Sequence, residues 1–183
     1  MNTQDYTKYA LRTESVPDTI SYNKETIITM LQIMFHASEI LDAIKKSVYY
    51  KRDIDLQGII AQHMKQIQIL SVQDVNTDAQ LTTENDITHI RNFHGLVGVL
   101  TESGELAYMF KKYLNNDVDI TNLKEELGDI NWYEAILCDT NNFTFDQVLE
   151  RNIEKLALRY RDKYSDHAAN NRDIDAEREI LSK

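Results

Sequence analysis

The chain has 183 residues, of which 42% are hydrophobic, and this suits one domain with a sizeable core. It contains only one proline and five glycines, and its formal net charge is −10. A negative balance of this size disfavours binding to nucleic acid or to an anionic membrane, because both require a cationic surface. It still allows a small anionic substrate that is bound through a divalent metal ion.

Cysteine usage and the N-terminal residues indicate the compartment. The single cysteine, Cys138, excludes a disulfide within the chain and is typical of a reducing environment. The N-terminal stretch carries no signal-peptide core, and no uninterrupted apolar run approaches the roughly eighteen residues of a membrane span. We therefore expect a soluble, cytoplasmic protein.

Apolar residues recur at helical spacing along most of the chain, and no strand pattern of useful length appears. The predicted fold class is therefore all-α. The fourth helix is expected to be interrupted near residues 92–95, and the polar residues 73–86 are expected to form a mobile loop. The predicted helices are, in chain order, 3–13, 24–50, 56–72, 87–114, 120–139, 144–164 and a charged helix from about residue 172.

Two acidic pairs are the strongest chemical signal: Glu102 and Glu105 in "LTESGELAYMF", and Glu126 and Asp129 in "LKEELGDINWY". Residues three apart lie on one face of a helix, so each pair directs two carboxylates to one side. If the two helices pack antiparallel, four carboxylates line one groove, where they repel one another unless cations are bound. Carboxylates suit Mg²⁺ or Mn²⁺. The alternative is that each pair belongs to a solvated helix face.

The same two helices are expected to pack through apolar stripes. Glu134 falls within the second stripe, where a hydrophobic residue is expected. The stripes consist of Leu96, Val99, Ser103, Leu106, Ala107 and Phe110 on the first helix, and of Leu123, Leu127, Ile130 and Leu137 on the second.

Four of the five glycines fall in this region. A glycine inside a helix costs about 1 kcal/mol relative to alanine, so a local packing demand is expected. We predict that Gly104 and Gly128 allow two helix backbones to approach closely beside the acidic groove. Gly95 and Gly98 are expected to open space at the start of the first motif helix.

The chain resembles the MazG-like, all-α nucleoside triphosphate pyrophosphohydrolases in three ordered segments: "GLVGVLTESGEL", "NLKEELGDINWY" and "VLERNIEKLALRYRDKYS". The likeness is to the single-domain members that bacteriophages often carry. It covers about residues 93–180 and "YTKYALRTES" near the start. It implies a MazG-like helical bundle of one domain over residues 1–183, with a catalytic motif region at 93–165. The chain departs from the family at about residues 15–91, where small members usually have a short connection, and this segment is expected to be an inserted helical hairpin.

The resemblance also implies Mg²⁺-dependent hydrolysis of a (d)NTP to the monophosphate and pyrophosphate. By position, Glu102, Glu105, Glu126 and Asp129 match the acids that bind metal and carry catalysis in the family. The positions that match substrate-facing residues are Asn152, Lys155 and Tyr160 on the third helix, and Lys111 or Lys112 for a phosphate-facing lysine.

Several points stay open at this stage. The general base is Glu125 or one of the four acids. Trp132 or Tyr133 is a candidate for stacking on a base, although packing is favoured for Trp132. The expected partners are the nucleotide and further copies of the chain in a homodimer or homotetramer, without nucleic acid or membrane. The alternatives are a catalytically silent nucleotide-sensing or protein-binding module on the same scaffold, and a hydrolase of guanosine tetra- or pentaphosphate.

Overall fold

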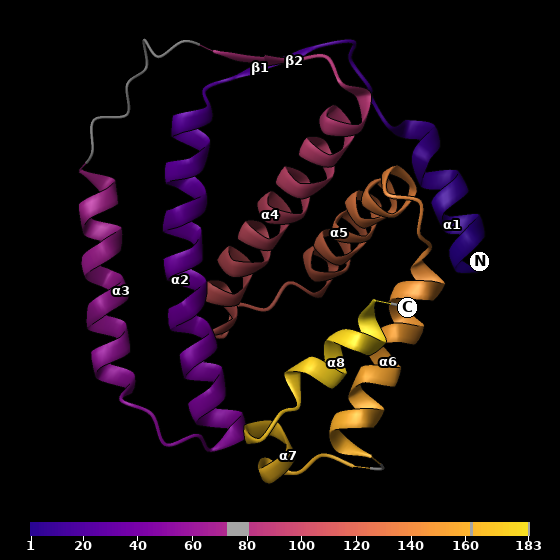
Figure 1. Cartoon of the computed structure of the whole chain (residues 1–183). Coiled ribbons are helices and arrows are strands. Elements are labelled where there is room, and N and C mark those ends of the chain that lie inside the picture. The colour runs from indigo at the N-terminus through magenta and orange to yellow at the C-terminus, as the bar shows by residue number, and fades with distance from the viewer. Residues whose placement is uncertain (73–80, 162, 183) are drawn as a thin grey trace. The chain divides into compact units, whose positions relative to one another are not determined.

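The computed structural model describes residues 1–72, 81–161 and 163–182, and it is all-α as predicted (Figure 1). The described strands, β1 (Ile20–Tyr22) and β2 (Thr82–Glu84), are three residues long and pair in a two-stranded sheet. The helices are α1 (Thr3–Ala10), the 3-10 helix η1 (Leu11–Thr13), α2 (Lys24–Tyr50), α3 (Leu56–Ser71), α4 (Ile87–Tyr113), α5 (Ile120–Thr140), α6 (Phe145–Tyr160), α7 (Asp166–Asn170) and α8 (Ile174–Leu181).

The chain divides into two compact units. Unit 1 comprises residues 1–20 and 83–150, and unit 2 comprises residues 21–82 and 151–183. Most of the predicted insertion at 15–91 therefore lies in unit 2, together with the last part of the predicted motif region. The description of one domain with an insertion stays a prediction.

Helix ends follow local capping. α2 begins at Lys24 because the Asn23 side chain accepts a hydrogen bond from the Thr26 backbone N–H at 3.0 Å. α6 ends at Tyr160, four residues before the predicted end, because Arg161 adopts the left-handed conformation with φ 54°. Residues 73–80 of the predicted loop lie outside the described residues, and β2 occupies part of the remainder.

The predicted interruption of α4 is wrong, because this helix runs unbroken through Gly95 and Gly98. Both glycines are buried against α5. A Cβ at Gly95 would lie 2.7 Å from Leu137, and a Cβ at Gly98 would lie 2.1 Å from the Tyr133 ring. Because residue 95 meets 137 and residue 98 meets 133, the two helices run antiparallel, as expected.

The prediction for the other two glycines is also wrong. A Cβ at Gly104 or Gly128 would meet no atom within 4 Å. The close approach of the helices is therefore made by Gly95 and Gly98, and the positions beside the acids face open space.

This difference predicts opposite effects of adding one methyl group. We expect Gly98→Ala to lower the free energy of unfolding by about 2 kcal/mol, because the Tyr133 ring must shift to make room. We expect Gly104→Ala to raise it by up to about 1 kcal/mol, because alanine favours the helix and meets nothing. Urea unfolding followed by the fluorescence of Trp132, the single tryptophan, reports on unit 1. Equal effects of the two substitutions would contradict this packing.

The predicted apolar stripes match the packed faces only in part. Leu137 packs against α4 at Gly95, as expected. Leu96, Phe110 and Leu127 are 56%, 51% and 46% exposed. The reason is that Gly95 and Gly98 form the α4 side of the contact, where they lie against Leu137 and Tyr133 of α5. The buried hydrophobic residues of these helices are Ile90, Ala135, Ile136 and Cys138.

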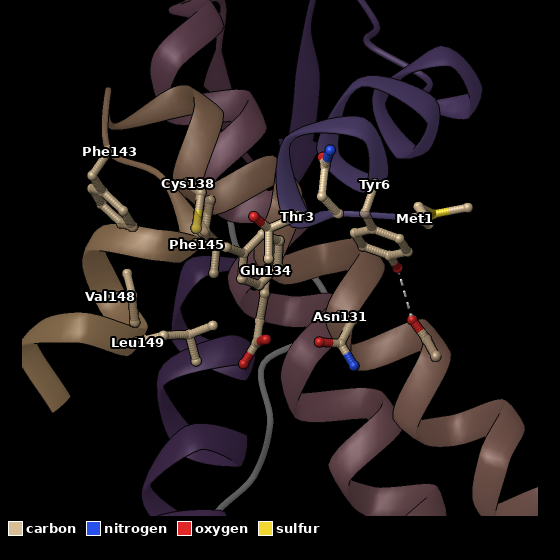
Figure 2. A pocket seen from close by; sticks show the side chains of 13 residues that line it. Met1, Thr3, Tyr6, Asn131, Glu134, Cys138, Phe143, Phe145, Val148 and Leu149 are labelled. Carbon is tan, nitrogen blue, oxygen red and sulfur yellow. Dashed lines mark hydrogen bonds between the residues drawn. The ribbon is translucent and has the colours of Figure 1, made fainter. Parts of the chain in front are cut away.

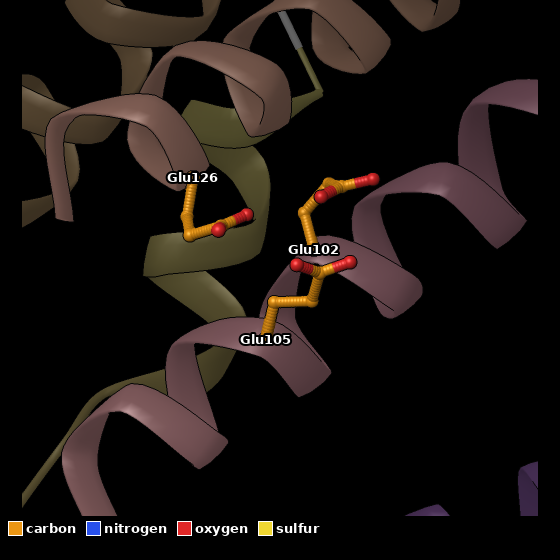
Figure 3. A group of neighbouring side chains, drawn as sticks. All are labelled: Glu102, Glu105 and Glu126. Atoms are coloured by element: carbon orange, nitrogen blue, oxygen red, sulfur yellow. The ribbon is translucent and has the colours of Figure 1, made fainter. Parts of the chain in front are cut away.

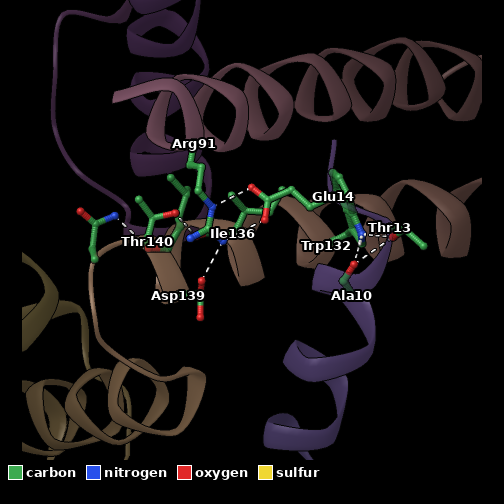
Figure 4. Close-up of polar contacts among 10 residues, drawn as sticks. Ala10, Thr13, Glu14, Arg91, Trp132, Ile136, Asp139 and Thr140 are labelled. Atoms are coloured by element: carbon green, nitrogen blue, oxygen red, sulfur yellow. Dashed lines mark hydrogen bonds and ion pairs between the residues drawn. The ribbon is translucent and has the colours of Figure 1, made fainter. Parts of the chain in front are cut away.

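A guanidinium joins three segments of unit 1 (Figure 4). Arg91 on α4 donates to both carboxylate oxygens of Glu14 at 2.9 and 2.8 Å, and it pairs with Asp139 on α5 at 2.7 Å. The hydrogen bond to Glu14 is the main cause that raises the pKa of Arg91, so the group stays charged. This network fixes the segment after η1 against the same two helices that carry the acids.

In unit 2, α2 and α3 pack against each other. By length and composition alone, α2 is long and apolar enough to cross a membrane, and among the described residues it alone meets this criterion. Polar residues such as Gln32 and His36 interrupt the apolar run, which is why no continuous stretch stood out in the sequence. A single helix of this kind is weak evidence, because core helices of soluble proteins meet the same criterion.

The C-terminal helices of unit 2 are joined by a buried carboxylate. Glu177 on α8 is only 3% exposed and accepts hydrogen bonds from Arg159 on α6 at 2.7 and 2.6 Å. Arg172 donates to the same carboxylate at 3.3 and 2.5 Å. These charged hydrogen bonds lower the pKa of Glu177 to about 2.

Candidate active site

Three carboxylates from two helices meet in unit 1 (Figure 3). Glu102 and Glu105 project from α4, and Glu126 projects from α5. One oxygen of each lies within 4.8 Å of the others. The three residues span the full range of burial, since Glu126 is buried, Glu102 is half-buried and Glu105 is exposed. The group is therefore anchored in the protein and open on one side.

The antiparallel packing explains this geometry. The contact of Gly98 with Tyr133 sets the register of α4 against α5, and the next turn of α4 then brings Glu102 and Glu105 beside Glu126. The Asn122 side chain, one turn before Glu126, donates a hydrogen bond of 2.5 Å to its carboxylate. Sequence reasoning missed Asn122, although its spacing of four residues from Glu126 on one helix was the available signal.

Asp129 does not belong to this group of three, but its charge acts on it. Burial is the main cause that raises the pKa of Glu102, followed by a hydrogen bond with Glu126 and by the charges of Glu105 and Asp129. Burial likewise raises the pKa of Tyr133, together with the charges of Glu102 and Asp129. The negative charge of Asp129 thus acts on both Glu102 and Tyr133, and the Tyr133 hydroxyl stays protonated.

The electrostatics of the site favour a bound cation. Crowded carboxylates in a partly buried position repel one another, and proton uptake or a cation relieves the repulsion. Three carboxylate oxygens at this spacing, without cysteine or histidine among them, are a donor set for a hard divalent ion such as Mg²⁺ or Mn²⁺. The residues present therefore fit the metal that the acidic pairs predicted.

The aromatic residues beside the acids pack within unit 1. The Trp132 indole donates to the Ala10 carbonyl at 3.0 Å and to the Thr13 hydroxyl at 2.9 Å (Figure 4). The His94 ring lies edge-on against Trp132 and Tyr133, with centroids 5.6 and 5.5 Å apart. Packing is therefore the role of Trp132, as the sequence favoured, and these rings support the helix that carries Glu126 and Asp129.

Glu134 faces a cavity rather than α4. The cavity of about 650 Å³ lies in unit 1 and is lined mainly by apolar side chains, among them Phe143 and Phe145 (Figure 2). Burial raises the pKa of Glu134, and it also raises the pKa of Cys138, on which the Glu134 charge acts as well. None of the three clustered acids lines this space. The position of Glu134 within the predicted stripe therefore reflected a wrong assignment of the helix face.

The other predicted site residues lie in two places. Lys111 and Lys112 are in the last turn of α4, with their ammonium groups 6.0 and 5.3 Å from the centre of the Tyr108 ring. Asn152, Lys155 and Tyr160 lie on the part of α6 that belongs to unit 2. There the Lys155 ammonium donates to the Asn152 side chain at 2.6 Å.

Comparisons with known proteins agree with the family resemblance seen in the sequence. Residues 94–163 match the family model described as "MazG nucleotide pyrophosphohydrolase domain". The "Gene 37 protein" of Mycobacterium phage L5 is 38% identical over 69 residues, which cover 34% of this chain and 60% of that protein. The chain thus spans less than two thirds of the length of this relative. No solved structure was found to match the chain.

The matched stretch contains α4 from residue 94 onward and the whole of α5 and α6. It carries the three clustered carboxylates and their antiparallel scaffold. Residues 94–163 of this chain are therefore similar to the MazG nucleotide pyrophosphohydrolase domain.

Proposed function

We propose that the protein is a Mg²⁺-dependent nucleoside triphosphate pyrophosphohydrolase that converts a (d)NTP into the (d)NMP and pyrophosphate. The observation that carries this proposal is the group formed by Glu102, Glu105 and Glu126, whose oxygens lie within 4.8 Å of one another. The match of residues 94–163 to the MazG domain supports the reaction class. A surplus or noncanonical nucleotide is the expected substrate.

In this proposal Glu102, Glu105 and Glu126 would hold the metal, and Asp129, the fourth matched acid, would add its negative charge beside them. A divalent cation there supplies charge neutralisation at the phosphates and makes a water molecule more acidic. The water oxygen forms a bond to the α-phosphorus, and the bond from that phosphorus to the pyrophosphate oxygen breaks. Glu125 or one of the four acids takes the proton of the water.

Two further groups of unit 1 are proposed to contact the substrate. The Tyr133 hydroxyl stays protonated and can donate a hydrogen bond at the mouth of the site. Lys111 and Lys112 follow Glu105 by two turns of α4, and one of them is proposed to contact phosphate. The exposed Glu105 side chain leaves the carboxylate group accessible to a nucleotide.

The experiment is a panel of the eight common (d)NTPs together with guanosine tetra- and pentaphosphate, each incubated with Mg²⁺. Phosphorus NMR of the products separates pyrophosphate plus monophosphate from orthophosphate plus diphosphate. We expect pyrophosphate from at least one (d)NTP and none after chelation of the metal with EDTA.

The same panel decides between the alternatives. Turnover of the alarmones alone would replace the proposal by an alarmone hydrolase. Nucleotide binding without any turnover would replace it by the silent sensing module. Release of orthophosphate would contradict attack at the α-phosphorus.

We further propose that copies of the chain associate as a homodimer or homotetramer in the cytoplasm, which is the host cytoplasm if a phage encodes the protein. Support comes from large apolar side chains that are half exposed on both acid-bearing helices, namely Leu96, Phe110 and Leu127. The molar mass from light scattering tests this, and the mass of one chain at micromolar concentration would contradict it.

A further inference from the structure

Two histidines face each other across a pair of helices in unit 2. His36 lies on α2 and His63 lies on α3, and these two helices run side by side (Figure 1). Their Nδ1 atoms are 2.9 Å apart, and both side chains are half-buried. Both residues belong to unit 2 and to the predicted insertion, whereas the clustered carboxylates belong to unit 1.

The surroundings of this pair are aliphatic. On each helix an isoleucine precedes the histidine by three residues and another follows it by four, which places them on one helix face. These half-buried residues are Ile33 and Ile40 on α2 and Ile60 and Ile67 on α3. Two polar rings within an aliphatic contact are unusual, because hydrophobic residues there would pack the helices without a demand for hydrogen bonds. Packing alone therefore does not explain the pair.

The short contact requires one proton between the two Nδ1 atoms. A neutral imidazole carries its proton on one ring nitrogen only, so one Nδ1 donates here and the other accepts. The ring centroids lie 5.1 Å apart at an interplanar angle of 50°. Phe35 lies edge-on against the His36 ring, with centroids 5.4 Å apart. The two rings are thus held with their Nδ1 atoms turned toward each other.

The separation of the two nitrogens suits a single metal ion. An imidazole nitrogen binds at about 2.0–2.1 Å, which separates two ligand nitrogens by about 2.9 Å at a right angle and by about 3.4 Å in a tetrahedron. The observed 2.9 Å matches the right angle of octahedral or square-planar coordination. Ni²⁺ and Cu²⁺ favour both imidazole ligands and this geometry.

We propose that His36 and His63 form a binding site for a divalent transition-metal ion of this class, Ni²⁺ or Cu²⁺, which joins α2 to α3. Both Nδ1 atoms coordinate the ion, and water fills the remaining positions on the open side of the half-buried rings. The ring that donates in the metal-free pair carries its proton on Nε2 when the ion is bound, so no net proton is released. The net charge of −10 favours the approach of a cation. The inference does not rest on the hydrolytic activity proposed above.

The test is calorimetric titration of the full, tag-free chain with Ni²⁺ in the presence of excess Mg²⁺. The Mg²⁺ competes for carboxylate ligands and leaves imidazole ligands free. We expect one saturable site whose affinity falls at least about tenfold in His36→Gln and in His63→Gln, because each substitution removes one of the two protein ligands. His167→Gln, which changes an exposed histidine of the same unit, is the matched control and should bind as the wild type does.

A second measurement uses the wild type alone, so it decides the question even where a substitution disturbs the fold. An ion that binds only the paired helices stabilises them, and Ni²⁺ should therefore slow amide hydrogen exchange in α2 and α3 around the two histidines. Exchange in α4 and α5 should stay unchanged in the same buffer. Absence of saturable Ni²⁺ binding, equal affinities of the wild type and both variants, or unchanged exchange in α2 and α3 would overturn the proposal.

Discussion

Glu126→Gln is expected to lower the rate of pyrophosphate release by about 10³-fold or more, while the fold stays intact. The substitution keeps the size of a side chain that is only 3% exposed, and it removes the charge from the most buried member of the three-carboxylate group. Loss of several kcal/mol of stabilisation by the metal corresponds to a rate change of this order. Steady-state kinetics with Mg²⁺ and the best substrate of the panel measure it.

A control separates the site from a general effect of charge. Glu150→Gln removes a carboxylate of the same unit that is exposed and outside the cluster, and its rate should equal that of the wild type. Asp129→Asn is expected to lower the rate as well, because the Asp129 charge acts on Glu102 of the carboxylate group. Full activity of Glu126→Gln, with circular dichroism like that of the wild type, would remove the carboxylate group from the mechanism.

Glu177→Gln is expected to lower the free energy of unfolding by about 3 kcal/mol at neutral pH. The change leaves two guanidinium groups of unit 2 without their shared buried carboxylate. A shift of the Glu177 pKa from 4.5 to about 2 corresponds to a loss of similar size. Urea unfolding followed by far-UV circular dichroism measures it. Glu179→Gln, an exposed change on the same helix, should have little effect.

The loss in Glu177→Gln should depend on pH in a defined direction. The pKa of Glu177 is lower in the folded state than in the unfolded chain, so the folded state is stabilised above about pH 4.5. This stabilisation disappears as the pH falls from 4.5 through about 2. The difference between wild type and variant should therefore be largest at neutral pH and shrink below pH 4.5. A difference that grows on acidification would contradict the buried ion pairs.

Local signals made the helices predictable. The caps Asn23 and Asp119 lie next to long runs of helical spacing, and the observed helices begin at the following residues, as expected. The strands were missed because three residues are too few to show an alternating pattern. The end of α6 was missed because the residue in the left-handed conformation is Arg161, whereas the usual sequence signal for such a helix end is a glycine.

The packed faces were not predictable from hydrophobicity alone. A stripe of bulky residues suggests a buried face, but α4 meets α5 through Gly95 and Gly98, where close backbone approach outweighs side-chain volume. The misplaced stripe also explains why Glu134 looked anomalous. Its carboxylate reaches a cavity on another side of α5.

The spacing of the acidic pairs was sufficient to predict that Glu102, Glu105 and Glu126 lie together. Their proximity depends only on helix geometry and on the antiparallel packing of α4 and α5. The supporting hydrogen bond from Asn122 was not apparent. Contacts within unit 2 were not apparent either, because they join residues more than one hundred positions apart, such as Arg52 and Asn170, and no local pattern contains them.

Binding of Mn²⁺ to the wild type and to Glu126→Gln tests the central claim most directly, because it measures the metal site without requiring turnover. Electron paramagnetic resonance of free Mn²⁺, in the presence of an α,β-imido nucleoside triphosphate that resists cleavage, reports the ion that the protein removes from solution. We predict one saturable protein-dependent site in the wild type and its loss in Glu126→Gln. Equal Mn²⁺ binding by both proteins would show that the clustered carboxylates of α4 and α5 do not hold the metal.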